Sequence, residues 1–173
     1  MGVAASLSPA QQARAVVIMA RAAPSTGCTD ANCVWLASNQ LYRALLQDNA
    51  TLAAHALDAI YGTMRVWPLS AGGMQADHSF GMHGDLLYSG GYGMEYVNGV
   101  MHTLLWTQGT RFALPAGDAR LTVFTDFLLD GSAQMIAYAA PGAHSPASPY
   151  GAAMWDVSTI GREIGRPYGA SNA

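Results

Sequence analysis

The side chains of this sequence that could take part in chemistry are concentrated between residues 67 and 93. This stretch contains seven glycines and five reactive side chains, namely His78, His83, Asp85, Tyr88 and Tyr92. Imidazole, carboxylate and phenol groups exchange protons and hold polar ligands, and some of them bind metal ions. Glycine lets a backbone approach a ligand closely. We therefore expect the functional site of the chain in this Gly-rich loop.

Two familiar kinds of site fit this loop poorly. His78, His83 and Asp85 are candidate metal ligands, but their spacing matches no metal motif that has a physical basis. The run Gly90–Gly93 suggests a phosphate-binding loop, but it lacks the lysine, the following Ser or Thr and the preceding strand of such loops. We therefore expect neither a metal nor a cofactor.

Helical periodicity precedes and follows the loop. Ser8 and Pro9 are typical of a helix start, and Pro24 is typical of a helix end. A second helix is predicted to begin at Thr29 or Asp30, which places Asn32 in its first turn. Three further helices are predicted: one that begins at Asn49 or Thr51 and extends to Met64, one over 94–106, and one over 118–138 with an interruption at residues 131–132.

The connections between the first three helices are short, which is typical of antiparallel helix hairpins. No segment alternates between apolar and polar residues for long, so no substantial sheet is expected. The predicted class is all-α. Within it, residues 67–93 form a long ordered loop.

Length and composition limit the possible functions. The 173 residues are 51% apolar with a formal net charge of −3, which fits a single domain over residues 1–173. All eight basic residues are Arg, and no basic cluster is present, so neither nucleic acid nor a membrane surface is an expected partner. No apolar run is long enough to span a bilayer, and the first 20 residues do not have the pattern of a signal peptide.

The chain has two cysteines, Cys28 and Cys33, in the segment CTDANC. Two cysteines are too few for a disulfide framework, so a pair of reduced thiols is favoured over a local disulfide. A disulfide would close a small loop around Asn32.

Three blocks of the sequence resemble the polysaccharide lyases of family 8, which include hyaluronate, chondroitin AC and xanthan lyases. DHSFGMHGDLLYSGGYG, at residues 77–93, is similar to the family's Asp-Gly-Ser-Phe loop, followed by a His and, nine residues later, a Tyr in a Gly-rich turn. Those residues are His83 and Tyr92 here. STGCTDANCVWLASNQLYRALL, at residues 25–46, resembles the block that supplies an Asn, here Asn32. STIGREIGRP, at residues 158–167, resembles a block with two arginines, here Arg162 and Arg166.

The resemblance implies a fold and an activity. The fold would be the later part of an incomplete α/α toroid built of antiparallel helix hairpins, and the protein would be extracellular. The activity would be β-elimination on a polysaccharide that contains uronic acid, such as hyaluronan or chondroitin. Two differences from the family pattern stand out. Residues 28–30 look like an insertion before Asn32, and His78 stands where the family usually has Gly.

The resemblance also implies roles for individual residues. Asn32, with His83, would neutralise the substrate carboxylate, and Tyr92 would remove the proton at C5 and hand it to the leaving oxygen. The ordinary pKa of a phenol is about 10, so a phenolate base needs a nearby cation, for which Arg162 is the candidate. His83 could instead share the role of base. Arg166, Tyr88 and Trp35 are the predicted substrate-binding residues.

Other interpretations of these residues remain open. Asn32 could simply cap a helix, Tyr92 and Trp35 could pack in a core, and the two arginines could lie on a solvated helix face. At the level of the whole chain, the alternative is a truncated, non-catalytic glycan-binding fragment. A third hypothesis is a helical interaction module unrelated to sugars. Exposed helix faces could also lead to self-association or to packing with a missing remainder of the lyase.

Overall fold

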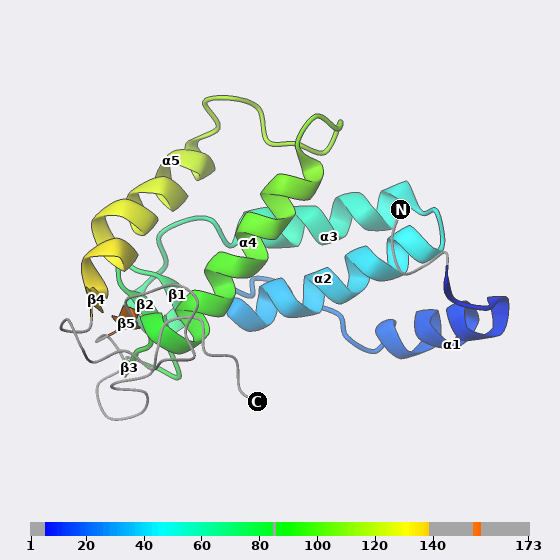
Figure 1. Ribbon diagram of the computed structural model, residues 1–173, viewed down its shortest axis with the longest axis horizontal. Coiled ribbons are helices and arrows are strands. Elements are labelled where there is room, and N and C mark those ends of the chain that lie inside the picture. The colour runs from blue at the N-terminus through cyan, green and yellow to red at the C-terminus, as the bar shows by residue number, and fades with distance from the viewer. Residues whose placement is uncertain (1–5, 85, 139–153, 157–173) are drawn as a thin grey trace. The chain divides into compact units, whose positions relative to one another are not determined.

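The computed structural model describes residues 6–84, 86–138 and 154–156 (Figure 1). These residues are mostly helical, as the sequence predicts. The helices are α1 (Pro9–Met19), α2 (Ala31–Leu46), α3 (Ala50–Gly62), α4 (Met94–Thr107) and α5 (Ala119–Asp126). The described residues divide into two compact units. The first extends up to Met64 and includes Tyr96–Asp118, and the second contains Arg65–Glu95 and the residues from Ala119 onward.

Helices α1, α2 and α3 begin at residues that the sequence analysis named as candidate helix starts. Ser8 forms a capping box with Gln11, and the Asn49 side chain accepts a hydrogen bond from the N–H of Leu52 at 2.9 Å. The Asp30 side chain accepts hydrogen bonds from the N–H groups of Asn32 and Cys33. Asn32 therefore lies in the first turn of α2, as predicted. The first helix is shorter than predicted, because it ends at Met19, before Pro24.

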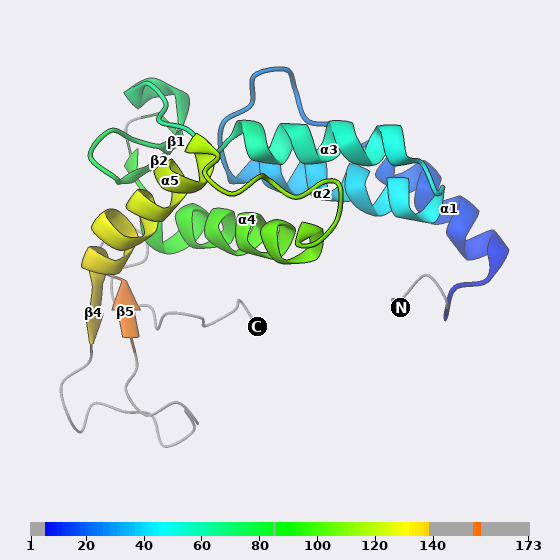
Figure 2. The same ribbon diagram turned by 90° about the horizontal axis from the view of Figure 1, so that it is seen from above.

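Helices α2 and α3 form an antiparallel hairpin and lie side by side in Figures 1 and 2. The apolar side chains buried in this unit come mainly from these two helices and include Val34, Ala37, Leu41, Ala53, Ala56, Leu57 and Ile60. Helix α4 approaches α2 closely, since a Cβ atom on Gly99 would lie 2.5 Å from Val34 Cγ1. The Gln40 side chain donates hydrogen bonds to the carbonyls of Met19 and Ala22, which ties the end of α1 to α2.

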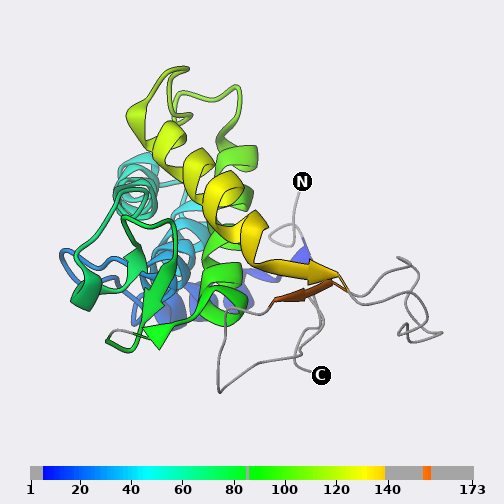
Figure 3. The same cartoon turned by 90° about the vertical axis from the view of Figure 1, so that its left-hand side faces the viewer.

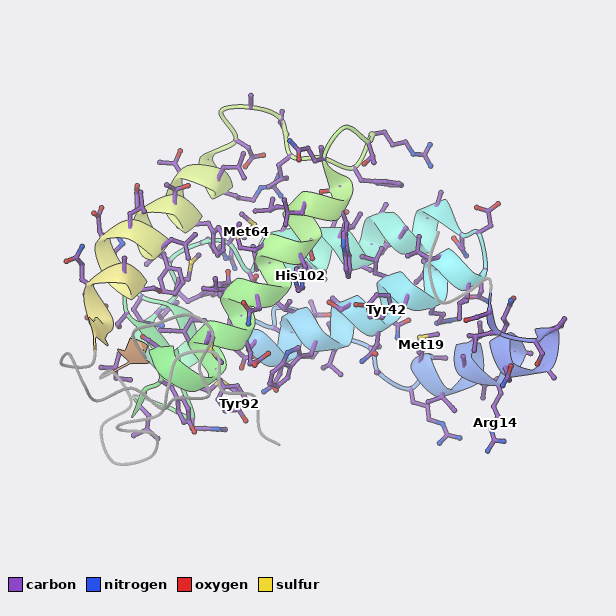
Figure 4. All side chains as sticks on the ribbon, viewed as in Figure 1. Arg14, Met19, Tyr42, Met64, Tyr92 and His102 are labelled. Carbon is purple, nitrogen blue, oxygen red and sulfur yellow. A yellow bond between two sulfur atoms is a disulfide. The ribbon has the colours of Figure 1, made fainter. Side chains whose placement is uncertain are left out.

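The apolar face of α2 is narrower than its sequence pattern indicates. Trp35, Tyr42 and Leu45 are among the large apolar side chains of this helix, but 41%, 43% and 66% of their surfaces are exposed. The Tyr42 ring lies 6.0 Å from the Trp106 ring of α4, and the His102 ring stacks on Trp106 at 5.8 Å. Tyr42 and His102 are labelled in Figure 4.

The second unit contains a small sheet that the sequence analysis did not predict. Strands β1 (Gly73–Met74), β2 (Phe80–Met82) and β3 (Leu86–Leu87) form an antiparallel sheet within the predicted loop. These strands have only two or three residues, which is too short to show a period of two. The core of this unit joins β2 to the turn that follows α5, because the ring of Phe80 lies 6.2 Å from that of Phe127 and both are buried.

The prediction of one helix over 118–138 is also corrected. Helix α5 passes into a π-turn at Phe127–Gly131 and a 3-10 turn at Ser132–Met135, where Gly131 and Ser132 predicted an interruption. The chain then forms strand β4 (Ile136–Tyr138), which pairs antiparallel with β5 (Met154–Asp156), as Figure 3 shows. In the described segments, no helix has both the length and the apolar character needed to cross a membrane.

Candidate active site

His83 lies at the tip of the hairpin between β2 and β3. Met82 pairs with Leu86, so three residues connect the two strands. His83 and Gly84 both have left-handed backbone conformations, with φ of 54° and 84°. Such conformations are typical of tight hairpin loops. The turn exposes the His83 side chain to solvent.

Tyr92 lies in the π-turn Ser89–Gly93, which leads directly into α4. The N–H of Tyr88 donates to the carbonyl of Phe80 at 2.8 Å, and the N–H of Gly93 donates to the carbonyl of Tyr88 at 3.0 Å. The first bond attaches the start of the turn to β2, and the second lies within the turn itself. Gly93 packs tightly there, since a Cβ atom at this position would lie 3.0 Å from Phe80 Cβ. The backbone that carries Tyr92 is therefore fixed relative to the backbone that carries His83.

The rings of His83, Tyr88 and Tyr92 form one cluster, which we call the aromatic cluster. The ring centroids of His83 and Tyr92 are 5.1 Å apart, and those of Tyr88 and Tyr92 are 5.2 Å apart, each pair nearly perpendicular. His83 and Tyr88 make a third edge-on contact at 6.1 Å. Tyr88 is 8% exposed, Tyr92 is partly exposed and His83 is exposed. The structure thus brings three of the predicted site residues together, and Figure 4 labels Tyr92.

His78 lies in the turn that precedes β2 and has φ of 62°, a left-handed conformation that favours glycine. Glycine is the residue that the resemblance to family 8 gives for this position. The Asp77 carboxylate accepts hydrogen bonds from the Ser79 hydroxyl at 2.7 Å and the Ser79 N–H at 3.0 Å. These bonds lower the pKa of Asp77 and close the turn.

Asn32 and Trp35 lie on α2, in the first compact unit. The Asn32 side chain is exposed, and Trp35 follows it by three residues on the same helix. Cys28 and Cys33 form a disulfide, so the prediction of reduced thiols is wrong. The turn capped by Asp30 brings their Cα atoms to 5.4 Å, within the range that a disulfide spans.

The remaining predicted residues are not brought into this cluster by the described structure. Arg162 and Arg166 lie outside the described residues, and so does Asp85. The aromatic cluster belongs to the second compact unit, whereas Asn32 and Trp35 belong to the first. Across the described segments, no group of three or more His, Cys, Asp or Glu side chains is arranged to hold a metal ion.

One further polar group of this loop was missed by the sequence analysis. The Ser89 hydroxyl, next to Tyr88, is buried and has no hydrogen-bond partner among the described residues. A buried hydroxyl without a partner is costly, so it is a candidate for binding water or ligand. In the sequence, only the position of Ser89 in the Gly-rich turn that carries Tyr92 indicates such a role.

The family model of the N-terminal α-helical domain of polysaccharide lyase family 8 matches residues 9–140. The chain belongs to this family. The match contains the Asn32 block and the aromatic cluster, and it ends before the block with Arg162 and Arg166. Among curated proteins, no sequence match to this chain is found.

Solved family 8 structures share the fold. A chondroitinase AC lyase studied as enzyme–oligosaccharide complexes is 26% identical, with a TM-score of 0.57 over 62% of this chain and 15% of that one. The Streptomyces coelicolor A3 chondroitin AC lyase in complex with chondroitin sulphate is 24% identical, with a TM-score of 0.64 over 75% of this chain and 18% of that one. A Paenibacillus xanthan lyase is 20% identical, with a TM-score of 0.60 over 73% of this chain and 12% of that one. The chain therefore spans less than a fifth of the length of each of these lyases.

Proposed function

We propose that this chain is part of a lyase that cleaves hyaluronan, chondroitin or a similar uronic-acid polymer by β-elimination. The observation that carries the proposal is the aromatic cluster, which holds a phenol and an imidazole side by side on a fixed backbone. Membership of polysaccharide lyase family 8 supports the same reaction class.

The proposed reaction begins with a proton that is hard to remove. The C5 hydrogen of the uronate lies next to an ionised carboxylate, which resists further negative charge. Hydrogen bonds from Asn32 and His83 to that carboxylate would spread the charge that develops in the transition state. Tyr92, as phenolate, would take the C5 proton. The electron pair of the C–H bond would form the C4–C5 double bond, and the glycosidic oxygen would leave C4 with the proton returned by Tyr92.

The other predicted residues would support this step. Arg162 would stabilise the phenolate, Arg166 would bind the anionic polymer, and Trp35 would stack on a sugar ring. Tyr88 is a predicted substrate-binding residue, although its burial favours a role in holding the rings of His83 and Tyr92. No step of this reaction uses a metal or a cofactor.

The surroundings of the site are also part of the proposal. We propose that the α2–α3 hairpin is one repeat of an incomplete α/α toroid and that residues 1–173 act as a single domain. The exposed apolar side chains of α2 and α4 would then pack against further helices or a second copy. The Cys28–Cys33 disulfide supports an extracellular location, since disulfides persist in oxidising compartments.

The proposal is tested by incubating the chain with hyaluronan, with chondroitin and with the uncharged polymer dextran. Elimination creates an unsaturated uronide that absorbs in the ultraviolet, so we expect absorbance to rise with the two uronic polymers and not with dextran. The alternative, a non-catalytic glycan-binding fragment, predicts heat of binding in calorimetric titration with hyaluronan and no product. If neither binding nor product is observed, both hypotheses are contradicted and a helical interaction module is favoured.

A further inference from the structure

The disulfide of this chain encloses the residue that the proposed function assigns to the substrate carboxylate. Cys28 and Cys33 are five positions apart, and Asn32 immediately precedes Cys33 in the first turn of α2. Any motion of the Asn32 backbone therefore has to occur within a small covalent ring.

The helix end of this ring is anchored in the core of the first compact unit. Cys33 is 1% exposed, and its helix neighbours Ala31 and Val34 are fully buried. The Asp30 carboxylate accepts hydrogen bonds from the N–H of Asn32 at 2.9 Å and the N–H of Cys33 at 3.2 Å. Asn32 is thus held by a side-chain cap and by a covalent link to the loop, while its own side chain faces solvent.

We infer that the Cys28–Cys33 disulfide is a positioning element for Asn32, which keeps the amide oriented toward a uronate carboxylate. This inference rests on the proposed function of Asn32. The first turn of a helix lacks the full set of backbone hydrogen bonds and frays easily. A group that stabilises a transition state loses most of its effect when it is misplaced by about 1 Å. A covalent ring around this turn removes that freedom before substrate binds.

A double-mutant cycle separates positioning from a general contribution to stability. The variant Cys28→Ser/Cys33→Ala removes the disulfide and fills the buried position with a small apolar side chain. In the disulfide-linked protein, Asn32→Ala is expected to lower kcat on hyaluronan by about 100-fold, as for loss of one transition-state donor. In the variant without the disulfide, the same substitution is expected to lower kcat by less than about 10-fold, because a mobile amide already contributes little. KM should change little in either background.

The result that overturns the inference is an equal effect of Asn32→Ala in both backgrounds. A disulfide that only stabilises the fold would give that result, since the amide would remain in place in every folded molecule.

Hydrogen exchange provides a second readout that does not depend on turnover. Removing the disulfide is expected to speed exchange of the Asn32 N–H by about 10-fold or more, while the N–H groups of Leu57 and Ile60 in α3 keep their rates. Unchanged exchange at Asn32 would overturn the inference even in an inactive protein. Absence of elimination product from the disulfide-linked protein would instead contradict the proposed function, so the two failures are distinguishable.

Discussion

Gly131 is the position where one added methyl group should disturb the second compact unit most. It ends the π-turn Phe127–Gly131 and packs against the left-handed turn at His78. A Cβ atom on Gly131 would meet the carbonyl oxygen of His78 and would lie 2.7 Å from His78 Cβ and 2.9 Å from its carbonyl carbon. Two of these three atoms belong to the backbone, so no side-chain rotation can relieve the overlap.

Two opposing contributions determine how much Gly131→Ala changes the free energy of unfolding. Overpacking of a buried contact costs about 1–3 kcal/mol, and the upper end applies here because backbone must move. Alanine favours a helical backbone over glycine by up to about 1 kcal/mol. We therefore expect Gly131→Ala to lower the free energy of unfolding by about 2 kcal/mol.

Urea denaturation of the wild-type chain and two variants measures this change. The matched control is Gly62→Ala at the end of α3, where an added Cβ has no atom within 4 Å. We expect Gly62→Ala to be neutral or to raise the free energy of unfolding by up to about 1 kcal/mol. If Gly131→Ala unfolds at the same urea concentration as the wild type or behaves like Gly62→Ala, the predicted overlap with the His78 backbone does not limit stability.

Three further predictions concern His78, Tyr88 and Tyr96. His78→Gly should raise the free energy of unfolding by about 1 kcal/mol in urea denaturation, because φ of 62° strains any residue with a Cβ; a loss of stability would contradict this. Tyr88→Leu should lower kcat on hyaluronan and leave KM nearly unchanged, while Tyr88→Phe should keep both; a raised KM would indicate direct substrate binding instead. Burial raises the pKa of the Tyr96 phenol above its ordinary value of 10.0. The unfolded chain therefore ionises first, so stability should be full below pH 10 and fall as the pH rises above it. Tyr96→Phe should flatten that fall in urea midpoints, and an equally steep fall in the variant would show that other groups cause it.

The helices were predictable because their ends are encoded locally. Ser8, Asp30 and Asn49 have short side chains that can accept hydrogen bonds from the first turn, and each of them caps a helix in the structure. The buried side of α3 was predictable from its apolar spacing, and its inward residues Ala53, Ala56, Leu57 and Ile60 are all buried.

The small sheet and the disulfide depend on contacts that a pattern search does not detect. The three strands of the second unit pair through backbone groups over only two or three residues each, so their side chains carry almost no periodic signal. Cys28 and Cys33 approach each other because Asp30 caps the turn between them, a consequence of local geometry rather than of cysteine count.

The candidate site was predictable in its residues and not in its geometry. His83 and Tyr92 were identified by the resemblance of the Gly-rich loop to family 8 lyases. The position of Tyr88 as the buried ring that contacts both could not be predicted, because it depends on the hairpin and the π-turn together. The roles of Arg162 and Arg166 stay predictions, since both residues lie outside the described segments.

We propose that the Tyr92 hydroxyl is the base of the elimination reaction, and the variant Tyr92→Phe tests this role. This variant keeps the ring that contacts His83 and Tyr88 and removes only the oxygen. We expect the rate of unsaturated uronide formation from hyaluronan to fall by about 10²- to 10⁴-fold, with unchanged stability toward urea. The control Tyr42→Phe, at an exposed tyrosine of α2, should keep the wild-type rate. Product formation by Tyr92→Phe at the wild-type rate would show that the Tyr92 phenol is not the base.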